Sequence, residues 1–283
     1  MLALSPLPAG RAVLRHTSTC CYSAARSRPP TRPRPAPAAS PPPPRLDVRY
    51  EDDRCLVLNK PAGVALQGQH GSTARRAWDA LLSAIRARPD CANAVPVHRL
   101  DKSTSGVLLL AKQPQHAARL SKQLQRHEIH RTYLAVVHGQ LKQGYAGEID
   151  APLRVEDDRV RLAQDGIEAK TAWACLAASP SFSLLSLKPA TGRKHQLRVH
   201  CADYLQAPIV GDFKIAPSAP HAAALSAHAI PHDTLLLHAT NLSFHAWEKS
   251  GRRTTITASA PPPSAFIRFC KAHKLALPPQ QGK

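Results

Sequence analysis

One carboxylate of the chain lies where a reactive group is expected: Asp101, within residues 97–106 (VHRLDKSTSG). The apolar run 107–110 (VLLL) predicts a buried strand, and the stretch 103–106 (STSG) favours a tight turn. A loop pinned by a packed sheet can hold a carboxylate rigidly, and functional groups concentrate on such loops. The structural alternative is that Asp101 only caps the turn or pairs with Arg99, which a short motif by itself does not exclude.

Residues 189–200 (PATGRKHQLRVH) place cations at the start of a predicted helix. Apolar residues recur at helical spacing from Leu197 onwards. Arg193, Lys194 and Arg198 crowd the first turn, where the helix dipole disfavours positive charge. We therefore expect an anion there, a phosphate or a carboxylate. A solvated basic face is the alternative.

The charge balance favours a polyanionic partner. The chain has 283 residues with 38 Lys and Arg against 19 Asp and Glu, a formal net charge of +19. Seven arginines and no acid lie in residues 1–45, which leaves +12 on residues 46–283. Nucleic acid is the commonest partner of a domain this basic. A lipid surface is less favoured because the sequence has no basic amphipathic helix with an aromatic face, and a solvated basic surface remains the alternative.

The cysteines and histidines predict no metal site. Seven cysteines, an odd number without CxxC spacing, indicate neither a disulfide framework nor a zinc knuckle, so a reducing compartment is expected. His195 and His200 are five residues apart, which does not match the i, i+4 spacing of a helical metal pair. No run approaches the roughly 18 apolar residues of a membrane span, and no membrane association is expected.

The N-terminal residues differ in composition from the rest. Residues 1–28 are rich in Arg, Ser, Ala and Leu and lack acids, which is typical of an organelle transit peptide. Residues 29–44 are largely Pro and favour a disordered linker. We therefore expect a transit peptide and linker over residues 1–45 and one folded domain over residues 46–283. A disordered extension without a targeting role is the alternative for the first segment.

Periodicity predicts a domain of many strands and few helices. Helices are expected at 72–88, with Ser72 as N-cap, at 114–127, with Pro114 in the first turn, from about 197, and at 264–274. Strands are expected at 55–59, 107–110, 131–139, 147–155, 159–163, 170–177, 182–187, 235–239 and 242–244. Residues 49–54 are interpreted as a turn and residues 216–232 as a loop. This order favours an α+β domain with a largely antiparallel sheet.

Three collinear segments resemble the RluA family of pseudouridine synthases: 58–63 (LNKPAG), 98–106 (HRLDKSTSG) and 191–200 (TGRKHQLRVH). The segments 131–135 (RTYLA) and 208–212 (PIVGD) extend the resemblance to residues 46–245. It implies a pseudouridine synthase catalytic domain over 46–283, with a central mixed, mostly antiparallel sheet, flanking helices and an RNA-binding cleft. It also implies that uridine becomes pseudouridine without a cofactor or metal: the N1–C1′ bond breaks, the uracil turns, and C5 is joined to C1′.

The resemblance assigns roles to individual residues. It implies that Asp101 is the essential carboxylate, acting as nucleophile or as base at the sugar, and that Tyr133 stacks on the uracil and helps to move a proton. The basic partner of Asp101 maps best onto Arg198, with Arg193 second. Such a partner is needed because burial raises the pKa of a carboxylate and an adjacent guanidinium lowers it. Residues expected to contact the RNA or to support the catalytic loop are Arg99, Lys60, Arg193 and His195.

The start of the chain and its single synthase domain resemble organellar family members that modify mitochondrial large-subunit rRNA. A mitochondrial location and this rRNA are therefore expected, with a plastid or cytoplasmic location and a tRNA target as alternatives. No S4-like RNA-binding domain is recognised ahead of residue 46, so recognition is expected to rest on the catalytic domain, acting as a monomer. After Gly211-Asp212 the family often has Tyr-Gly, whereas this chain has Phe213-Lys214.

Two alternatives come from other functional classes. One is a catalytically idle rRNA-binding or ribosome-assembly factor on the same fold. The other, a glycosidase-like hydrolase, is disfavoured because it needs two carboxylates that flank the bond, and the motifs supply one.

Overall fold

The computed structural model describes residues 46–67, 72–157, 159–247 and 251–279. Ten strands have the bounds β1 Val48–Glu51, β2 Cys55–Lys60, β3 Val95–Pro96, β4 Ser105–Ala111, β5 His130–His138, β6 Ala146–Asp150, β9 Lys170–Ala178, β10 Phe182–Pro189, β11 Leu237–Trp247 and β12 Arg253–Ser259. A separate hairpin is formed by β7 Leu153–Glu156 and β8 Arg159–Leu162. The helices are α1 Thr73–Arg86, α2 Pro114–Gln125, α3 Gln196–Val199, α4 His221–Ser226 and α5 Ser264–Ala272.

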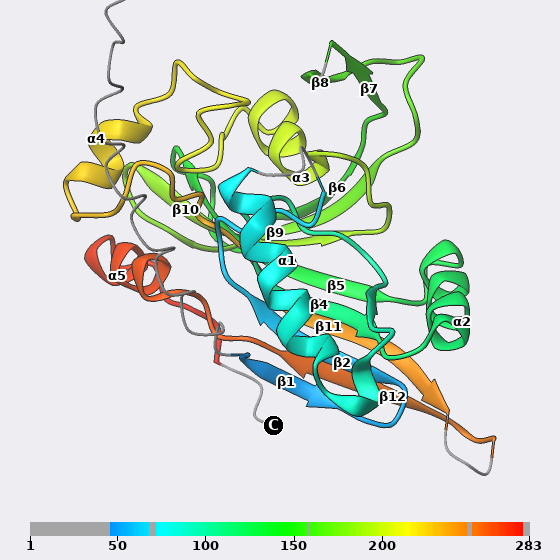
Figure 1. The fold of residues 1–283 in the computed structure, drawn as a ribbon. Coiled ribbons are helices and arrows are strands. Elements are labelled where there is room, and N and C mark those ends of the chain that lie inside the picture. The colour runs from blue at the N-terminus through cyan, green and yellow to red at the C-terminus, as the bar shows by residue number, and fades with distance from the viewer. Residues whose placement is uncertain (1–45, 68–71, 158, 248–250, 280–283) are drawn as a thin grey trace, which may run out of the picture. The chain divides into compact units, whose positions relative to one another are not determined.

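The ten strands form one sheet with the order β1-β2-β4-β11-β5-β10-β9-β6 (Figure 1). In addition, β12 pairs with β11 and β3 pairs with β4. Among the described residues every strand pair is antiparallel except β4 with β11. The fold is therefore α+β with a mixed, mostly antiparallel sheet, which confirms the fold class predicted from the sequence. The predicted transit peptide and linker, residues 1–45, lie outside the described residues.

Helices cover both faces of the sheet. Side chains alternate between the faces along strand β5: Tyr133, Ala135 and Val137 belong to the larger hydrophobic core, and Leu134 and Val136 belong to a second one. The larger core also contains buried side chains from α1, α2 and α3, and the second core contains side chains from α4 and α5. Figure 1 shows α1 crossing the front of the sheet. No helix in the described residues has both the length and the apolar character to cross a bilayer.

Two predicted helix starts are confirmed, and the helix expected from residue 197 differs in form. Ser72 caps α1 by accepting a hydrogen bond from the N–H of Arg75, and Pro114 occupies the first turn of α2. At the third site, α3 has only four α-helical residues and continues as a π-helical turn, His200–Tyr204. A π turn widens a helix locally and often accompanies a functional site.

The structure corrects several predicted elements. The strands expected at 235–239 and 242–244 are one strand, β11, because a register shift between Ala239 and Asn241 carries the pairing past the polar residues there. Residues 49–54 are not all turn: part of this segment belongs to β1, where Tyr50 packs edge-on against Phe244. The expected loop 216–232 contains α4, which buries Leu225 in the second core. Strand β12 was not predicted at all.

Candidate active site

Asp101 lies in the loop between β3 and β4, and backbone hydrogen bonds hold this loop. The N–H of Thr104 donates to the Asp101 carbonyl at 3.1 Å, and the N–H of Gly63 donates to the Lys102 carbonyl at 2.8 Å. The Asp101 side chain is 17% exposed and lines a cleft of about 660 Å³. The loop therefore holds one carboxylate in a fixed place at an accessible cleft.

Lys60, at the end of β2, holds this loop through hydrogen bonds to backbone carbonyls. Its side chain is fully buried, and its ammonium donates to the carbonyls of Pro61, Val64 and Lys102 at 2.9, 3.0 and 3.4 Å. Burial lowers the pKa of Lys60 to about 7, and the negative charge of Asp101 opposes this shift. Lys60 does not line the cleft, so its bonds connect the turn after β2 to the loop that carries Asp101.

Arg198, in α3, joins Asp101 to a second carboxylate. Its Nε and Nη2 donate to Asp212 Oδ2 and Oδ1 at 2.8 and 2.6 Å, and its Nη1 lies 3.4 Å from Asp101 Oδ2. The Arg198 and Asp212 side chains are 9% and 1% exposed. Burial alone would lower the pKa of Arg198, but the bonds to Asp212 and the charge of Asp101 outweigh this effect and raise it. The sequence predicted an anion beside this helix start. For Arg198 the anions are the carboxylates of Asp212 and Asp101.

Asp212 belongs to the site although the sequence patterns did not single it out. The segment 208–212 had been noted only as part of the resemblance. A signal was available: Asp212 is a lone carboxylate that follows the apolar pair Ile209 and Val210 after one glycine, and the structure buries that pair. An acidic residue in such a position needs a buried cation as its partner. The sequence alone does not say which of the 38 basic residues supplies that cation.

The turn between β10 and α3 is organised by the Gln196 side chain. Its Oε1 accepts hydrogen bonds from the Arg193 N–H at 3.0 Å and from the Thr191 hydroxyl at 2.8 Å. Its Nε2 donates to the Lys170 carbonyl, on β9, at 2.9 Å. One buried amide thus fixes the backbone from which two predicted site residues, Arg193 and His195, project.

Arg193 and His195 both line the cleft with Asp101. Arg193 Nε donates to the carbonyl of Glu168 at 2.8 Å, and the guanidinium does not bond to Asp101. His195 has a left-handed backbone with φ of 53°, and its buried Nδ1 has no hydrogen-bond partner among the described residues. Burial lowers the pKa of His195, and the charge of Asp101 opposes this shift.

Arg99, Tyr133 and Arg131 also line the cleft. Arg99 bonds to the side chain of Gln67 and not to Asp101. Tyr133 is buried in β5, and burial raises its pKa. Arg131, which the sequence patterns placed only in a strand, is buried and donates to the Thr191 carbonyl at 3.2 Å. The predicted residues Asp101, Tyr133, Arg198, Arg99, Arg193 and His195 therefore share one cleft, and Lys60 lies behind it.

The cleft is strongly basic. Among the described residues that line it, Asp101 is the only acid, and the arginines are Arg99, Arg131, Arg193 and Arg198. A basic, concave surface attracts a polyanion and positions it over the single carboxylate. Hydrolysis of a glycosidic bond by an acid–base pair would need a second carboxylate in the cleft.

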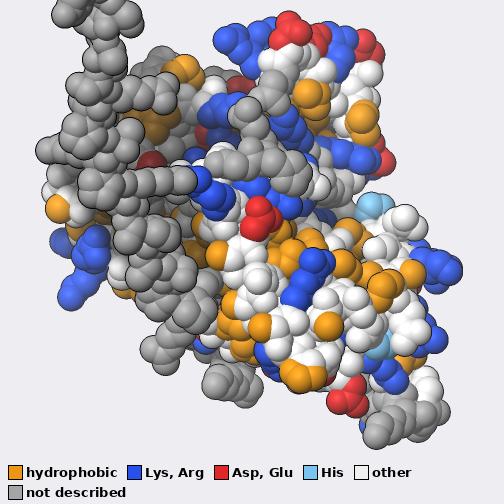
Figure 2. Space-filling model, viewed as in Figure 1, with side chains coloured by type: hydrophobic (Ala, Val, Ile, Leu, Met, Phe, Trp, Pro, Cys, Tyr) orange, Lys and Arg blue, Asp and Glu red, His pale blue; other side chains and the backbone are white. Residues whose placement is uncertain are grey.

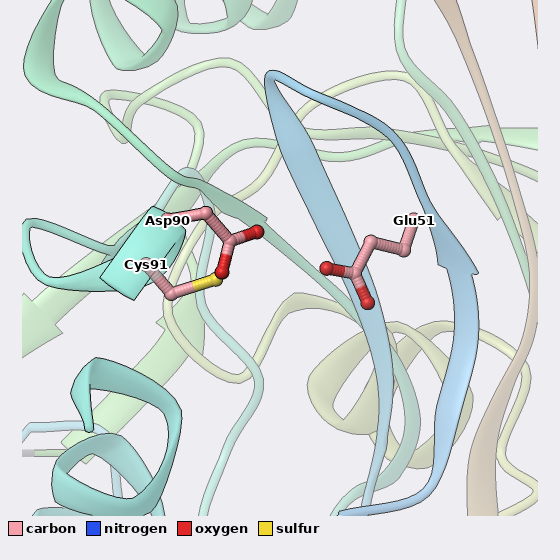
Figure 3. A group of neighbouring side chains, drawn as sticks. All are labelled: Glu51, Asp90 and Cys91. Carbon is pink, nitrogen blue, oxygen red and sulfur yellow. The ribbon is translucent and has the colours of Figure 1, made fainter. Parts of the chain in front are cut away.

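Within the described residues, one group of three potential metal ligands lies close together: Glu51, Asp90 and Cys91 (Figure 3). Lys112 Nζ already lies 2.7 Å from Glu51 and 2.5 Å from Asp90, and Arg88 also bonds to Glu51. Burial raises the pKa of the Cys91 thiol. The group is therefore an ion-pair network whose carboxylates are already neutralised by side chains, and its donor set does not suit a metal.

Comparison with known proteins identifies the family. The RNA pseudouridylate synthase family matches residues 54–203, which contain Asp101, Tyr133 and Arg198. The chain is 39% identical over 238 residues to ribosomal large subunit pseudouridine synthase D of Xanthomonas campestris pv. campestris, a match that covers 80% of this chain and 69% of that protein. It is 33% identical over 273 residues to a mitochondrial pseudouridylate synthase of Xenopus tropicalis, covering 83% and 82%.

The fold agrees with this assignment. The solved structure of human RNA pseudouridylate synthase domain containing 4 superposes with a TM-score of 0.65 at 24% identity, covering 82% of this chain and 95% of the human one. Because the sequence match covers more than half of the chain and includes the cleft, the chain belongs to the RNA pseudouridylate synthase family and is an RNA pseudouridine synthase, an isomerase.

Proposed function

We propose that Asp101 is the essential carboxylate of this enzyme and that Arg198 is its cationic partner. The observation that carries the proposal is the 3.4 Å contact between Arg198 Nη1 and Asp101 Oδ2 at the edge of a cleft with no other lining acid among the described residues. The guanidinium supplies positive charge next to a carboxylate that can attack C1′ or remove a proton from the sugar.

The uneven sharing of Arg198 suits this role. Asp212 takes two short bonds from the guanidinium, and Asp101 takes one long contact. The two bonds to Asp212 therefore fix the position of the guanidinium. Asp101 lies next to this positive charge but makes only one contact with it, so its carboxylate is not bound at both oxygens. The remaining lone pairs of Asp101 are available to the sugar of a nucleotide that enters the cleft.

Tyr133 and the arginines of the cleft complete the proposed site. A uridine must leave its stack to reach Asp101, and a cleft of about 660 Å³ is of the size that holds a small ligand. We assign Tyr133 to the face of the uracil, Arg99, Arg193 and His195 to the RNA around it, and Lys60 to support of the catalytic loop. The reaction is an isomerisation: the N1–C1′ bond breaks, C5 bonds to C1′, and the C5 proton is transferred to N1.

We further infer a mitochondrial enzyme that acts on large-subunit rRNA, with residues 1–45 as transit peptide and linker and residues 46–283 as catalytic domain. The acid-free, Arg-rich start supports the location. The relatives named for the ribosomal large subunit and for the mitochondrion support the substrate and the compartment. A tRNA target is the competing function.

A map of pseudouridines in mitochondrial rRNA and tRNA tests the proposal. Cells that lack the protein are complemented with the wild-type chain, with Asp101→Asn, or with Asp53→Asn as a control in an exposed turn. We expect one large-subunit rRNA site to be present with the wild-type and control chains and absent with Asp101→Asn, while the RNA affinity of the purified variant is unchanged. A missing tRNA site instead would assign the tRNA target, and an Asp101→Asn map identical to the wild-type map would overturn the assignment of Asp101 as the essential carboxylate.

A further inference from the structure

A second basic pocket lies next to the catalytic cleft. It has a volume of about 530 Å³, and Arg54, Arg119, Lys122, Arg126 and Arg253 line it. The only acid among its described lining residues is Glu128, which pairs with Arg253 at 2.8 Å. Three of the cations, Arg119 and Lys122 in α2 and Arg126 at its C-cap, lie on one side of the helix because they are separated by three and four residues. The buried Nη1 of Arg54 has no hydrogen-bond partner among the described residues.

An aromatic ring lies among these cations. Trp247, the last residue of β11, lines the pocket, and the guanidinium carbon of Arg119 is 6.0 Å from the centre of its ring. The buried Gln123 side chain holds α2 against this strand, since it donates to the His245 carbonyl and accepts from the His245 N–H, both at 2.9 Å. The helix that carries these cations and the strand that carries the tryptophan are thus held together.

The C-terminal end of α2 separates this pocket from the cleft. Leu124, Gln125 and His127 line the cleft, whereas Lys122 and Arg126 line the pocket. In Figure 2 blue side chains reach the right-hand margin of the view, where Figure 1 places α2. A helix is about 10 Å across, so an extended RNA strand that leaves the cleft would cross this end within about three nucleotides.

We propose that this pocket binds the single-stranded RNA that flanks the target uridine, with Trp247 stacking on a base and the surrounding cations binding phosphates. The proposal rests on the proposed function, because it takes the RNA in the cleft as its ligand. An aromatic ring among arginines is the combination that binds single strands without sequence preference. The pocket would lengthen the RNA contact beyond the cleft and add affinity for substrates with an unpaired flank.

Binding of two RNA probes by the full chain tests this. The first is a hairpin with uridines in its loop, and the second is the same hairpin with about ten unpaired nucleotides added at its 5′ or 3′ end, within the site sizes of single-strand-binding proteins. We expect the extension to tighten binding by the wild-type chain about tenfold. In the Arg119→Gln/Lys122→Gln variant this gain should disappear, and the salt dependence for the extended RNA should weaken by about 1.4 in the log–log slope.

Two further variants make the test specific. Trp247→Ala should lose the gain from the extension, and Trp247→Phe should keep it, because phenylalanine still stacks. The matched control Arg268→Gln/Lys271→Gln removes the same charge from exposed positions of α5, and its gain should equal that of the wild-type chain. The proposal is overturned if the extension adds no affinity, if the gain survives in the α2 and Trp247→Ala variants, or if the α5 control loses it equally.

Failure of this proposal is distinguishable from failure of the proposed function. The binding gain needs no catalysis, so Asp101→Asn should retain it in full. If Asp101→Asn leaves the pseudouridine map unchanged while the gain depends on Arg119, Lys122 and Trp247, the catalytic assignment fails and the pocket stands. If Asp101→Asn abolishes the modification while the binding gain does not depend on Arg119, Lys122 and Trp247, the pocket proposal fails and the catalytic assignment stands.

Discussion

Arg198 and Asp212 form a two-point salt bridge, with N–O distances of 2.6 and 2.8 Å, and the third nitrogen of the same guanidinium lies 3.4 Å from Asp101. This pairing separates two tasks. Asp212 holds the guanidinium in place, and in the proposed site the guanidinium supplies positive charge next to Asp101. A buried cation in a fixed position can act on the neighbouring carboxylate without reorganisation.

The Asp212→Asn variant should lose both stability and activity. The amide cannot accept two charged bonds, so Arg198 stays buried without its anion, which costs about 3–5 kcal/mol of the free energy of unfolding. Turnover should fall because the guanidinium beside Asp101 is no longer held. Urea unfolding and single-turnover kinetics measure the two effects. Asp150→Asn, which breaks an exposed pair with Lys170, is the control and should change neither. Equal behaviour of the two variants would contradict the role of Asp212.

Lysine substitutions separate the two candidate partners of Asp101. Arg198→Lys removes the fork that spans Asp212 and Asp101, so kcat should fall by about 100-fold. Arg193→Lys keeps a charge at a position bonded to a backbone carbonyl, so it should alter RNA affinity and leave kcat within a few-fold of the wild-type value. A larger kcat loss for Arg193→Lys would transfer the partner role to Arg193.

Removal of the Tyr133 hydroxyl tests proton transfer apart from stacking. Burial raises the pKa of Tyr133, so the hydroxyl remains protonated at neutral pH and acts as a donor. Tyr133→Phe should keep RNA affinity and lower kcat by about 100- to 10,000-fold, the usual contribution of a general acid or base. Tyr133→Leu should weaken binding as well, because it also removes the ring. Tyr145→Phe, at an exposed tyrosine, is the control, and a wild-type kcat for Tyr133→Phe would limit Tyr133 to stacking.

Lys60 should make stability depend on pH. Burial lowers its pKa to about 7 from the usual 10.5, so between these values the unfolded chain binds a proton that the folded chain does not. The contribution of Lys60 to the free energy of unfolding therefore rises as the pH rises from 7 to 10.5, and the same amount is lost as the pH falls from 10.5 to 7. The free energy of unfolding, measured with urea at several pH values in this range, should change with pH at different rates for the wild type and for Lys60→Met. Parallel curves would show that Lys60 does not titrate there.

Gly106 connects the catalytic loop to the centre of the sheet. It has φ of +117°, and a Cβ there would lie 2.1 Å from the Ala239 carbonyl oxygen, where β4 pairs with β11. Gly106→Ala should therefore push the two strands apart, reduce the free energy of unfolding by more than about 3 kcal/mol and displace Asp101. Gly139→Ala is a close control, since Gly139 also has positive φ, +93°, but open space around it. Gly139→Ala should reduce the free energy of unfolding by about 1–2 kcal/mol. Equal reductions for the two variants would show that small backbone shifts relieve the contact with Ala239.

Local sequence was sufficient for much of the scaffold. The apolar run after Asp101 predicted β4, and the side chains at 117, 120 and 124 predicted the buried stripe of α2. Ser72 and Pro114 marked helix starts because capping and φ restriction act within one turn of the chain. Asp101 could be placed on a loop between strands for the same reason, since that loop is defined by its immediate neighbours, but its role as the reactive carboxylate came from the resemblance.

Other features depended on long-range contacts. The register shift that makes β11 one continuous strand depends on its pairing with β5. Residues 221–226 form α4 because Leu225 packs into the second core. The sequence ranked Arg198 above Arg193 only by resemblance, and it gave no sign that Asp212 is the residue that holds Arg198. Which buried charges face one another is decided when distant segments pack together, because the free energy of a buried charge depends on its final partners and not on its neighbours along the chain.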